Sequence, residues 1–201
     1  MGRFRAGRVH IGVDFDDVLY PYHHYLKRRL QRRFGIDLTR RRVTTFYYDV
    51  LPEFGKAGIT REQVWAEVQA TWDEVESHAE APLLDPQAAP VLRDLARRHR
   101  VTVVTARHND AKQVLRRFLD RHRIRPHDIL VGRLEKKGFD ALIDDFPSHA
   151  LENAAGGGWS LLYTIDENST FDETRHPRVV RVASWSEVRQ VIERLEAVRR
   201  A

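Results

Sequence analysis

The amino-acid sequence predicts an α/β protein with a doubly wound, mostly parallel, Rossmann-like sheet and a small helical unit inserted after the first strand. Two observations support this prediction. Short apolar runs rich in β-branched residues alternate with amphipathic helical segments, which is typical of parallel strands joined by helices. A long stretch between the first two apolar runs has helical periodicity but no strand pattern, which indicates an insertion.

The first strand is predicted at residues 11–15, where the sequence is mostly apolar. The insertion starts with a helix over 23–34, in which large apolar residues recur at four-residue spacing before a glycine. Residues 36–59 are predicted to be irregular, and a capping box at Thr60 starts a second helix that reaches about residue 77. These boundaries divide the chain into a helical insertion at residues 20–84 and a core formed by residues 1–19 and 85–201.

The rest of the chain alternates helices with strands. A helix from residue 88 precedes a β-branched run at 101–106, which is typical of a buried parallel strand. The later strands are predicted at 128–131, 139–145, 161–165 and 179–182. The later helices are predicted at 109–122, from Pro147 to the glycines at 156–158, and from a second capping box at 184–187.

Composition narrows the class of protein. The 201 residues, of which 42% are hydrophobic, are enough for one large core with a modest insertion. No run approaches the ~18 consecutive apolar residues of a membrane span, and the basic start lacks the apolar run of a secretory signal. We therefore expect a cytoplasmic protein. The chain has no cysteine, which excludes disulfides and thiolate chemistry, and its net charge of +5 favours anionic partners.

Reactive side chains gather at the predicted carboxyl ends of three strands, which share one edge of such a sheet. Asp14 and Asp16 end the first strand and point the same way, because residues two apart share a face. Thr105 ends the second strand of the core, and Asp144 and Asp145 end a later one. Clustered acids repel one another, and a hard dication with oxygen ligands, such as Mg²⁺, is the natural counterion.

These groups suit phosphoryl transfer onto an aspartate. A carboxylate can attack phosphorus, and a second acid can protonate the leaving oxygen and later deprotonate water. A hydroxyl, a lysine (Lys136 or Lys137) and the helix start at residues 107–109 can bind the remaining phosphate oxygens.

Four segments of the chain resemble, in order, the four motifs of the haloacid dehalogenase-like phosphatase superfamily. They are Asp14-Phe-Asp16-Asp17-Val-Leu, Thr105-Ala-Arg, a lysine, and Ile143-Asp-Asp145. The resemblance spans about residues 8–196, and the insertion resembles the type 1 cap of that superfamily. The pattern Leu-Ile-Asp-Asp and the closing Ser-Trp-Ser-Glu-Val are similar to the 5′(3′)-deoxyribonucleotidase (5′-nucleotidase type C) family and its bacterial relatives.

The resemblance implies a Mg²⁺-dependent phosphomonoester hydrolase that forms an aspartyl-phosphate and acts on (deoxy)nucleoside monophosphates. Asp14 would be the nucleophile and Asp16 the general acid/base. Mg²⁺ would be held by Asp14, by the backbone carbonyl of Asp16 and by Asp145, with Asp144 adjacent.

The phosphate would be bound, by the same resemblance, by Thr105, Ala106 and a lysine. Lys136 sits nearest the expected distance before Asp145, Lys137 is its neighbour, and Lys112 is a third choice.

The chain departs from the family pattern at three places. Asp17 stands where the family usually has glycine, Val18-Leu19-Tyr20 replaces small or hydroxylated residues, and Ala106-Arg107 replaces Ser-Pro. Arg107 could reach the substrate phosphate or pair with the acidic cluster, and both roles stay open.

Phe46 and Tyr47 are candidates for stacking on a nucleobase because they lie in an irregular stretch, and the alternative is packing inside the insertion. His23 and His24 are adjacent on a predicted helix, so their side chains diverge. We expect both on the surface and no metal site based on histidine.

Other functions remain as alternatives. They are a phosphatase of another small metabolite, a receiver-like phospho-acceptor, and a nucleic-acid-binding protein that uses the arginines at 28–33 and 40–42. The insertion and the acid/base argue against a receiver, and a solvated surface is the simpler role for the arginines. The expected partner is therefore a small phosphomonoester, with neither a nucleic acid nor a membrane, and a homodimer is left open.

Overall fold

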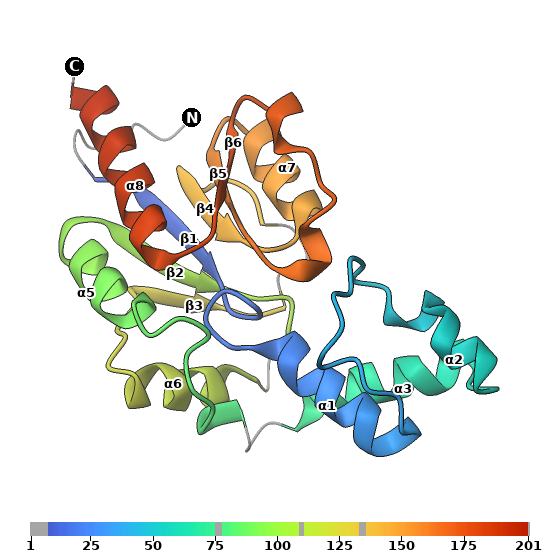
Figure 1. Ribbon diagram of the computed structural model, residues 1–201. Helices are drawn as coiled ribbons and strands as arrows, with labels where there is room; N and C mark the ends of the chain where they lie inside the picture. The colour runs from blue at the N-terminus through green and yellow to red at the C-terminus, as the bar shows by residue number, and fades with distance from the viewer. Residues whose placement is uncertain (1–7, 75–77, 109–110, 133–135, 201) are drawn as a thin grey trace.

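The computed structural model describes residues 8–74, 78–108, 111–132 and 136–200. The fold is a six-stranded, fully parallel sheet with strand order β3-β2-β1-β4-β5-β6 (Figure 1). The strands are β1 (His10–Asp14), β2 (Arg100–Val104), β3 (Asp128–Leu130), β4 (Ala141–Asp144), β5 (Trp159–Tyr163) and β6 (Val179–Val182). The predicted fold class is thus confirmed, and each predicted strand lies within two residues of an observed one.

Seven α-helices and three short 3-10 helices lie wholly within the described part of the chain. The α-helices are α1 (Tyr22–Phe34), α2 (Pro52–Lys56), α3 (Arg61–Asp73), α5 (Ala88–Arg98), α6 (Lys112–Arg121), α7 (Pro147–Ala155) and α8 (Trp185–Arg200). The 3-10 helices are η1 (Tyr48–Val50), η3 (Asp166–Asn168) and η4 (Glu173–Arg175). In the described residues, no helix has both the length and the apolar content that a membrane crossing needs.

Alternate residues of each strand pack against different helices. Ile11, Val13 and Ile143 belong to the large core cluster, together with the buried residues of α5, α6 and α8. Leu162 on the opposite face packs with Ala150 of α7. Since residues two apart share a face, Asp14 emerges on the α7 face, away from the large core.

The insertion contains α1, η1, α2 and α3, which lie together at one side of the sheet (Figure 1). The Thr60 capping box is present at the start of α3. Residues 36–59 were predicted to be irregular, but they contain η1 and α2. The local reason is that Pro52 can occupy the first turn of a helix and Phe54 is buried in the large core.

Candidate active site

The carboxyl ends of β1 and β4 lie side by side and present their acids together. Register pairs Val13 of β1 with Val103 of β2 and with Ile143 of β4. The residues that follow, Asp14 and Asp144, are therefore neighbours at one edge of the sheet. This placement follows from parallel pairing, in which all strands end on the same side.

Lys136 connects the two acids. Its Nζ lies 2.7 Å from Asp14 Oδ1 and 2.9 Å from Asp144 Oδ2, and the residue is 1% exposed. Asp14 Oδ1 also accepts the Phe15 N–H at 2.7 Å, so this oxygen is fixed by two donors. The structure thus places Lys136 at the cluster, whereas Lys137 is exposed.

Asp144 is held by several donors. Its Oδ1 accepts the Phe146 N–H at 2.9 Å and lies 3.2 Å from His149 Nδ1. Although burial opposes it, Lys136 and then His149 lower the pKa of Asp144. His149 was not among the predicted site residues, and its position in the first turn of α7, five residues after Asp144, is the sequence signal that could have suggested it.

Asp16 is paired with Arg107. The guanidinium donates two hydrogen bonds to the carboxylate, with Nε–Oδ2 at 3.0 Å and Nη2–Oδ1 at 2.6 Å. Arg107 is 3% exposed, and its guanidinium lies over the rings of Phe15 and Tyr20. Of the two roles left open for Arg107, the structure shows the pairing with the acidic cluster.

Asp17 and His23 form a buried pair. Asp17 has a left-handed backbone with φ of 51°, a conformation that aspartate tolerates better than most residues. Its carboxylate accepts the backbone N–H of His23 at 3.0 and 3.3 Å, and its Oδ2 lies 2.5 Å from His23 Nδ1.

The expectation that His23 lies on the surface is wrong. His23 and His24 do diverge, but the first turn of α1 faces Asp17, so His23 is buried and only His24 is exposed. The signal in the sequence is the acid that replaces glycine at position 17, because a carboxylate near a helix start can accept that helix's free N–H groups.

Asp145 completes the cluster at the end of β4 and is 5% exposed. Among the described residues, none donates a hydrogen bond to its side chain, while Asn168 donates to its backbone carbonyl at 2.8 Å. Burial, and then repulsion from Asp17 and Asp14, raises the pKa of Asp145 well above its usual value. Burial likewise raises the pKa of Asp14 to about 7, against the effect of Lys136.

A cavity of about 270 Å³ joins the acids to the insertion. Asp14, Asp16, Asp17, Asp145, Thr105, Ala106 and Lys136 line its polar end. The other lining residues are mostly apolar or aromatic, and they include Tyr22, Leu26, Phe46, Tyr47, Trp65, Val68, Trp72 and Phe146. The predicted phosphate and base ligands therefore face one cavity, with Phe46 half-buried and Tyr47 61% exposed.

Two groups of these side chains could hold a metal ion in the described part of the chain. Asp14, Asp144 and Asp145 form one group and Asp17, His23 and Asp145 the other, and within each group the ligand atoms lie within 4.8 Å of one another. The first group offers only oxygen ligands, as Mg²⁺ prefers. The second combines the imidazole of His23 with two carboxylates.

The six-stranded parallel sheet with a helical insertion after its first strand is the fold of the haloacid dehalogenase-like hydrolases. Solved structures of similar fold include a haloacid dehalogenase-like hydrolase from Streptococcus pneumoniae, with a TM-score of 0.65 and 16% identity over 92% of this chain and 98% of that one. Another is a HAD-family hydrolase from Deinococcus radiodurans with bound phosphate and sodium, with a TM-score of 0.61 and 15% identity over 94% and 96%. A third is the HAD-hydrolase YfnB from Bacillus subtilis, bound to magnesium, with a TM-score of 0.59 and 14% identity over 92% and 98%.

The family is shown by a match between the sequence and a family model. The model of the family "5′ nucleotidase, deoxy (Pyrimidine), cytosolic type C protein" matches residues 8–199, and the chain belongs to that family. It is therefore a phosphoric monoester hydrolase, which confirms the predicted superfamily and enzyme class. Among curated proteins, no relative of the chain was found.

Proposed function

We propose that this enzyme hydrolyses (deoxy)nucleoside monophosphates in the presence of Mg²⁺, through an aspartyl-phosphate on Asp14. The observation that supports this most is the fixed orientation of Asp14. Lys136 and the Phe15 N–H bind one carboxylate oxygen, Oδ1, and no described residue donates to Oδ2. One oxygen is thus held in place while the other is free to attack phosphorus.

The other residues of the cavity have separate roles in the proposed reaction. Asp16 would donate a proton to the leaving oxygen and then take one from the water that hydrolyses the acyl phosphate, which regenerates both acids. Lys136 and Thr105 would bind the transferred phosphoryl oxygens, beside the backbone of Ala106. Arg107 would orient Asp16 rather than bind the substrate, because both of its hydrogen bonds to Asp16 are made without a ligand.

The donor set of the oxygen-only group fits Mg²⁺. Asp14 and Asp145, with the backbone carbonyl of Asp16, would hold the ion, with Asp144 adjacent. Asp145 is suited to this role because it is buried and accepts no hydrogen bond from the described residues. Bound Mg²⁺ supplies positive charge that offsets the nucleophile and the phosphate and keeps them together.

We further propose that residues 20–84 act as a cap that selects the substrate. The chain leaves the core at Leu19 and returns at Leu84, and the Leu84 N–H donates to the Leu19 carbonyl at 2.8 Å. The apolar walls of the cavity come mainly from this segment, and flat aromatic walls suit a nucleobase. A cytoplasmic location belongs to the same proposal, since the family is described as cytosolic. The homodimer stays a prediction.

The experiment is phosphate release from a panel of deoxynucleoside 5′- and 3′-monophosphates and other small phosphomonoesters, with Mg²⁺ or with chelator. We expect nucleotides to be the best substrates and Asp14→Asn to lower the rate by about 10⁴-fold or more. Asp120→Asn, an exposed change on α6, is the control. Wild-type turnover by Asp14→Asn would contradict the proposal, and a phosphoryl-enzyme that lasts for minutes would favour the receiver-like alternative.

The nucleic-acid alternative is not favoured by the arginines of the insertion. Arg29 and Arg33 pair with Glu67 of α3, and Arg41 pairs with Glu53 of α2. Arg29 and Arg33 thus link α1 to α3, and Arg41 links the following loop to α2, so these three charges are compensated within the insertion.

A further inference from the structure

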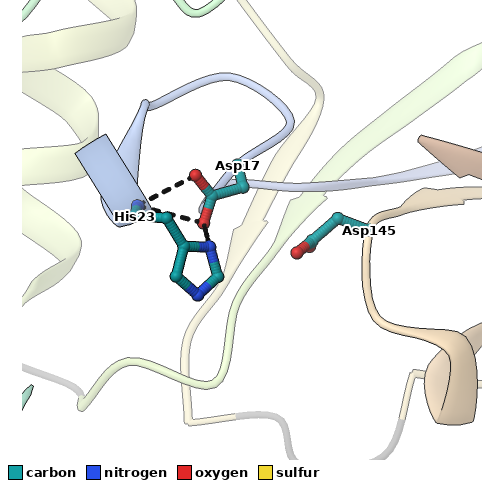
Figure 2. Close-up of side chains that lie close together, drawn as sticks. All are labelled: Asp17, His23 and Asp145. Atoms are coloured by element: carbon teal, nitrogen blue, oxygen red, sulfur yellow. Dashed lines mark hydrogen bonds and ion pairs between the residues drawn. The ribbon is translucent and has the colours of Figure 1, made fainter. Parts of the chain in front are cut away.

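Asp17, His23 and Asp145 converge from three segments of the chain. Asp17 lies in the turn after β1, His23 in the first turn of α1, and Asp145 at the end of β4. Figure 2 shows the Asp145 carboxylate directed toward Asp17 and His23. One ligand atom from each residue lies within 4.8 Å of the others, and all three residues are buried.

The contacts within this group leave the Asp145 carboxylate without a donor and pair the His23 imidazole only with Asp17. The backbone N–H of His23 fixes the Asp17 carboxylate, and His23 Nδ1 forms an ion pair with Asp17 Oδ2 at 2.5 Å, although this contact does not have the geometry of a hydrogen bond. Asp145 is 5% exposed, and its carboxylate accepts no hydrogen bond from the described residues. Both groups are directed into the same space, which is the arrangement expected of ligands to a shared ion.

The balance of buried charge also indicates a cation between Asp17 and Asp145. Lys136 forms ion pairs with Asp14 and Asp144, and Arg107 forms one with Asp16. Asp17 and Asp145 then have one nearby imidazole, that of His23, between them. Two buried carboxylates with so little compensation are costly, and a divalent cation between them would remove that cost.

We propose that Asp17, His23 and Asp145 form a second divalent-cation site, which takes a transition metal such as Zn²⁺, Co²⁺ or Mn²⁺. An imidazole with two carboxylates suits these ions, whereas Mg²⁺ prefers oxygen ligands alone. Bonds of about 2.0–2.2 Å to such ions fit the spacing of the three ligand atoms, once the His23–Asp17 pair opens slightly. Asp145 belongs to both metal groups, so the second ion would lie beside the proposed Mg²⁺.

A structural role is the competing explanation. In that case the Asp17 carboxylate only caps α1 through the backbone N–H of His23, and the imidazole is an ordinary ion-pair partner. The two explanations differ in what the ring contributes, because a cap requires the His23 backbone but not its side chain.

The test is calorimetric titration of the metal-free enzyme with Zn²⁺, Mn²⁺ and Mg²⁺, with His23→Gln compared to His24→Gln. The second variant is a matched control, since His24 is the adjacent, exposed histidine of the same helix turn. We expect His23→Gln to weaken Zn²⁺ and Mn²⁺ binding by about 10- to 100-fold and to leave Mg²⁺ binding unchanged. Equal Zn²⁺ affinities in the two variants would overturn the proposal.

Anomalous diffraction from wild-type crystals containing Mn²⁺ or Zn²⁺ is the second measurement, and it does not depend on a variant that folds. We expect a peak at bonding distance from His23 Nδ1, about 2.0–2.3 Å. A peak confined to Asp14 and Asp144 would overturn the proposal. Asp14→Asn separates this inference from the proposed function, because that variant should lose phosphate release but keep the peak at His23.

Discussion

Lys136 is the residue on which the charge balance of the site depends. It is fully buried among carboxylates, and its Nζ contacts both Asp14 and Asp144. Although burial opposes it, Asp14 and then Asp144 raise the pKa of Lys136, so the lysine remains charged. A buried charge of this kind is stable only with its partners, and the reverse also holds for the two acids.

Replacement of Lys136 by methionine should therefore damage both stability and activity. We expect Lys136→Met to lower the free energy of unfolding by about 3–5 kcal/mol, because two buried carboxylates lose their cation. Lys137→Met, at the exposed neighbour, should change it by less than about 0.5 kcal/mol. Urea unfolding and phosphate release measure the two effects, and equal behaviour of the two variants would show that Lys136 is not the lysine of the site.

At this scale the sequence predicted residues whose chemistry is unusual for their position. A cluster of acids directly after an apolar strand is unusual, and this pattern predicts Asp14, Asp16, Asp144 and Asp145 as site residues. His23 could not be placed, because its burial depends on the left-handed turn at Asp17 and on how α1 leaves β1. Neither feature has a periodic signal in the sequence.

At the scale of elements, β1 is positioned by a close approach on the α7 face. A Cβ built at Gly12 would lie 2.7–2.8 Å from ring atoms of Phe139, closer than side chains pack. Glycine at this position thus lets the Phe139 ring lie directly on the strand that carries Asp14. The packing of β1 and the position of the nucleophile are therefore linked.

Gly12→Ala tests this packing. We expect it to destabilise the protein by about 1–3 kcal/mol, the usual cost of overpacking. Phe139→Leu in the same chain should relieve the clash. The double variant should therefore be about 0.5–3 kcal/mol more stable than the sum of the two single effects predicts. Denaturant unfolding of the four proteins gives the coupling, and strict additivity would show that Gly12 and Phe139 do not compete for space.

Elements were predictable where a local pattern determines them. Strands of β-branched residues, and α3 behind its capping box, were located to within a few residues because their signals are local. The short α2 was missed because five residues carry no periodicity, and its position depends on Phe54 packing into the core. The helix α3 ends at Asp73, before the predicted end near residue 77, and the predicted start of the next helix at residue 109 lies outside the described residues.

At the scale of the whole molecule, the site works against the stability of the fold. The acids lie at one edge of an otherwise apolar sheet, and the Asp145 carboxylate has no hydrogen-bond or ion-pair partner among the described residues. Its raised pKa means that the folded protein holds a proton there that the unfolded chain loses, so stability falls as pH rises from about the unfolded value of 3.8 toward the folded one. A bound cation would reverse this loss, because it binds the folded state alone.

Asp145→Asn should therefore make the metal-free protein more stable while removing its response to Mg²⁺. Without metal, we expect a gain of about 0.5–2 kcal/mol that is larger at pH 8 than at pH 4, since protonated aspartic acid already resembles asparagine in charge. In the wild type, Mg²⁺ at 100 times its dissociation constant should add about 2.7 kcal/mol to the free energy of unfolding, and in the variant little. Thermal or urea unfolding with chelator and with Mg²⁺ measures both, with Asp120→Asn as control. If metal-free Asp145→Asn is instead less stable than the wild type, the carboxylate is compensated within the fold, and neither metal group needs an ion to exist.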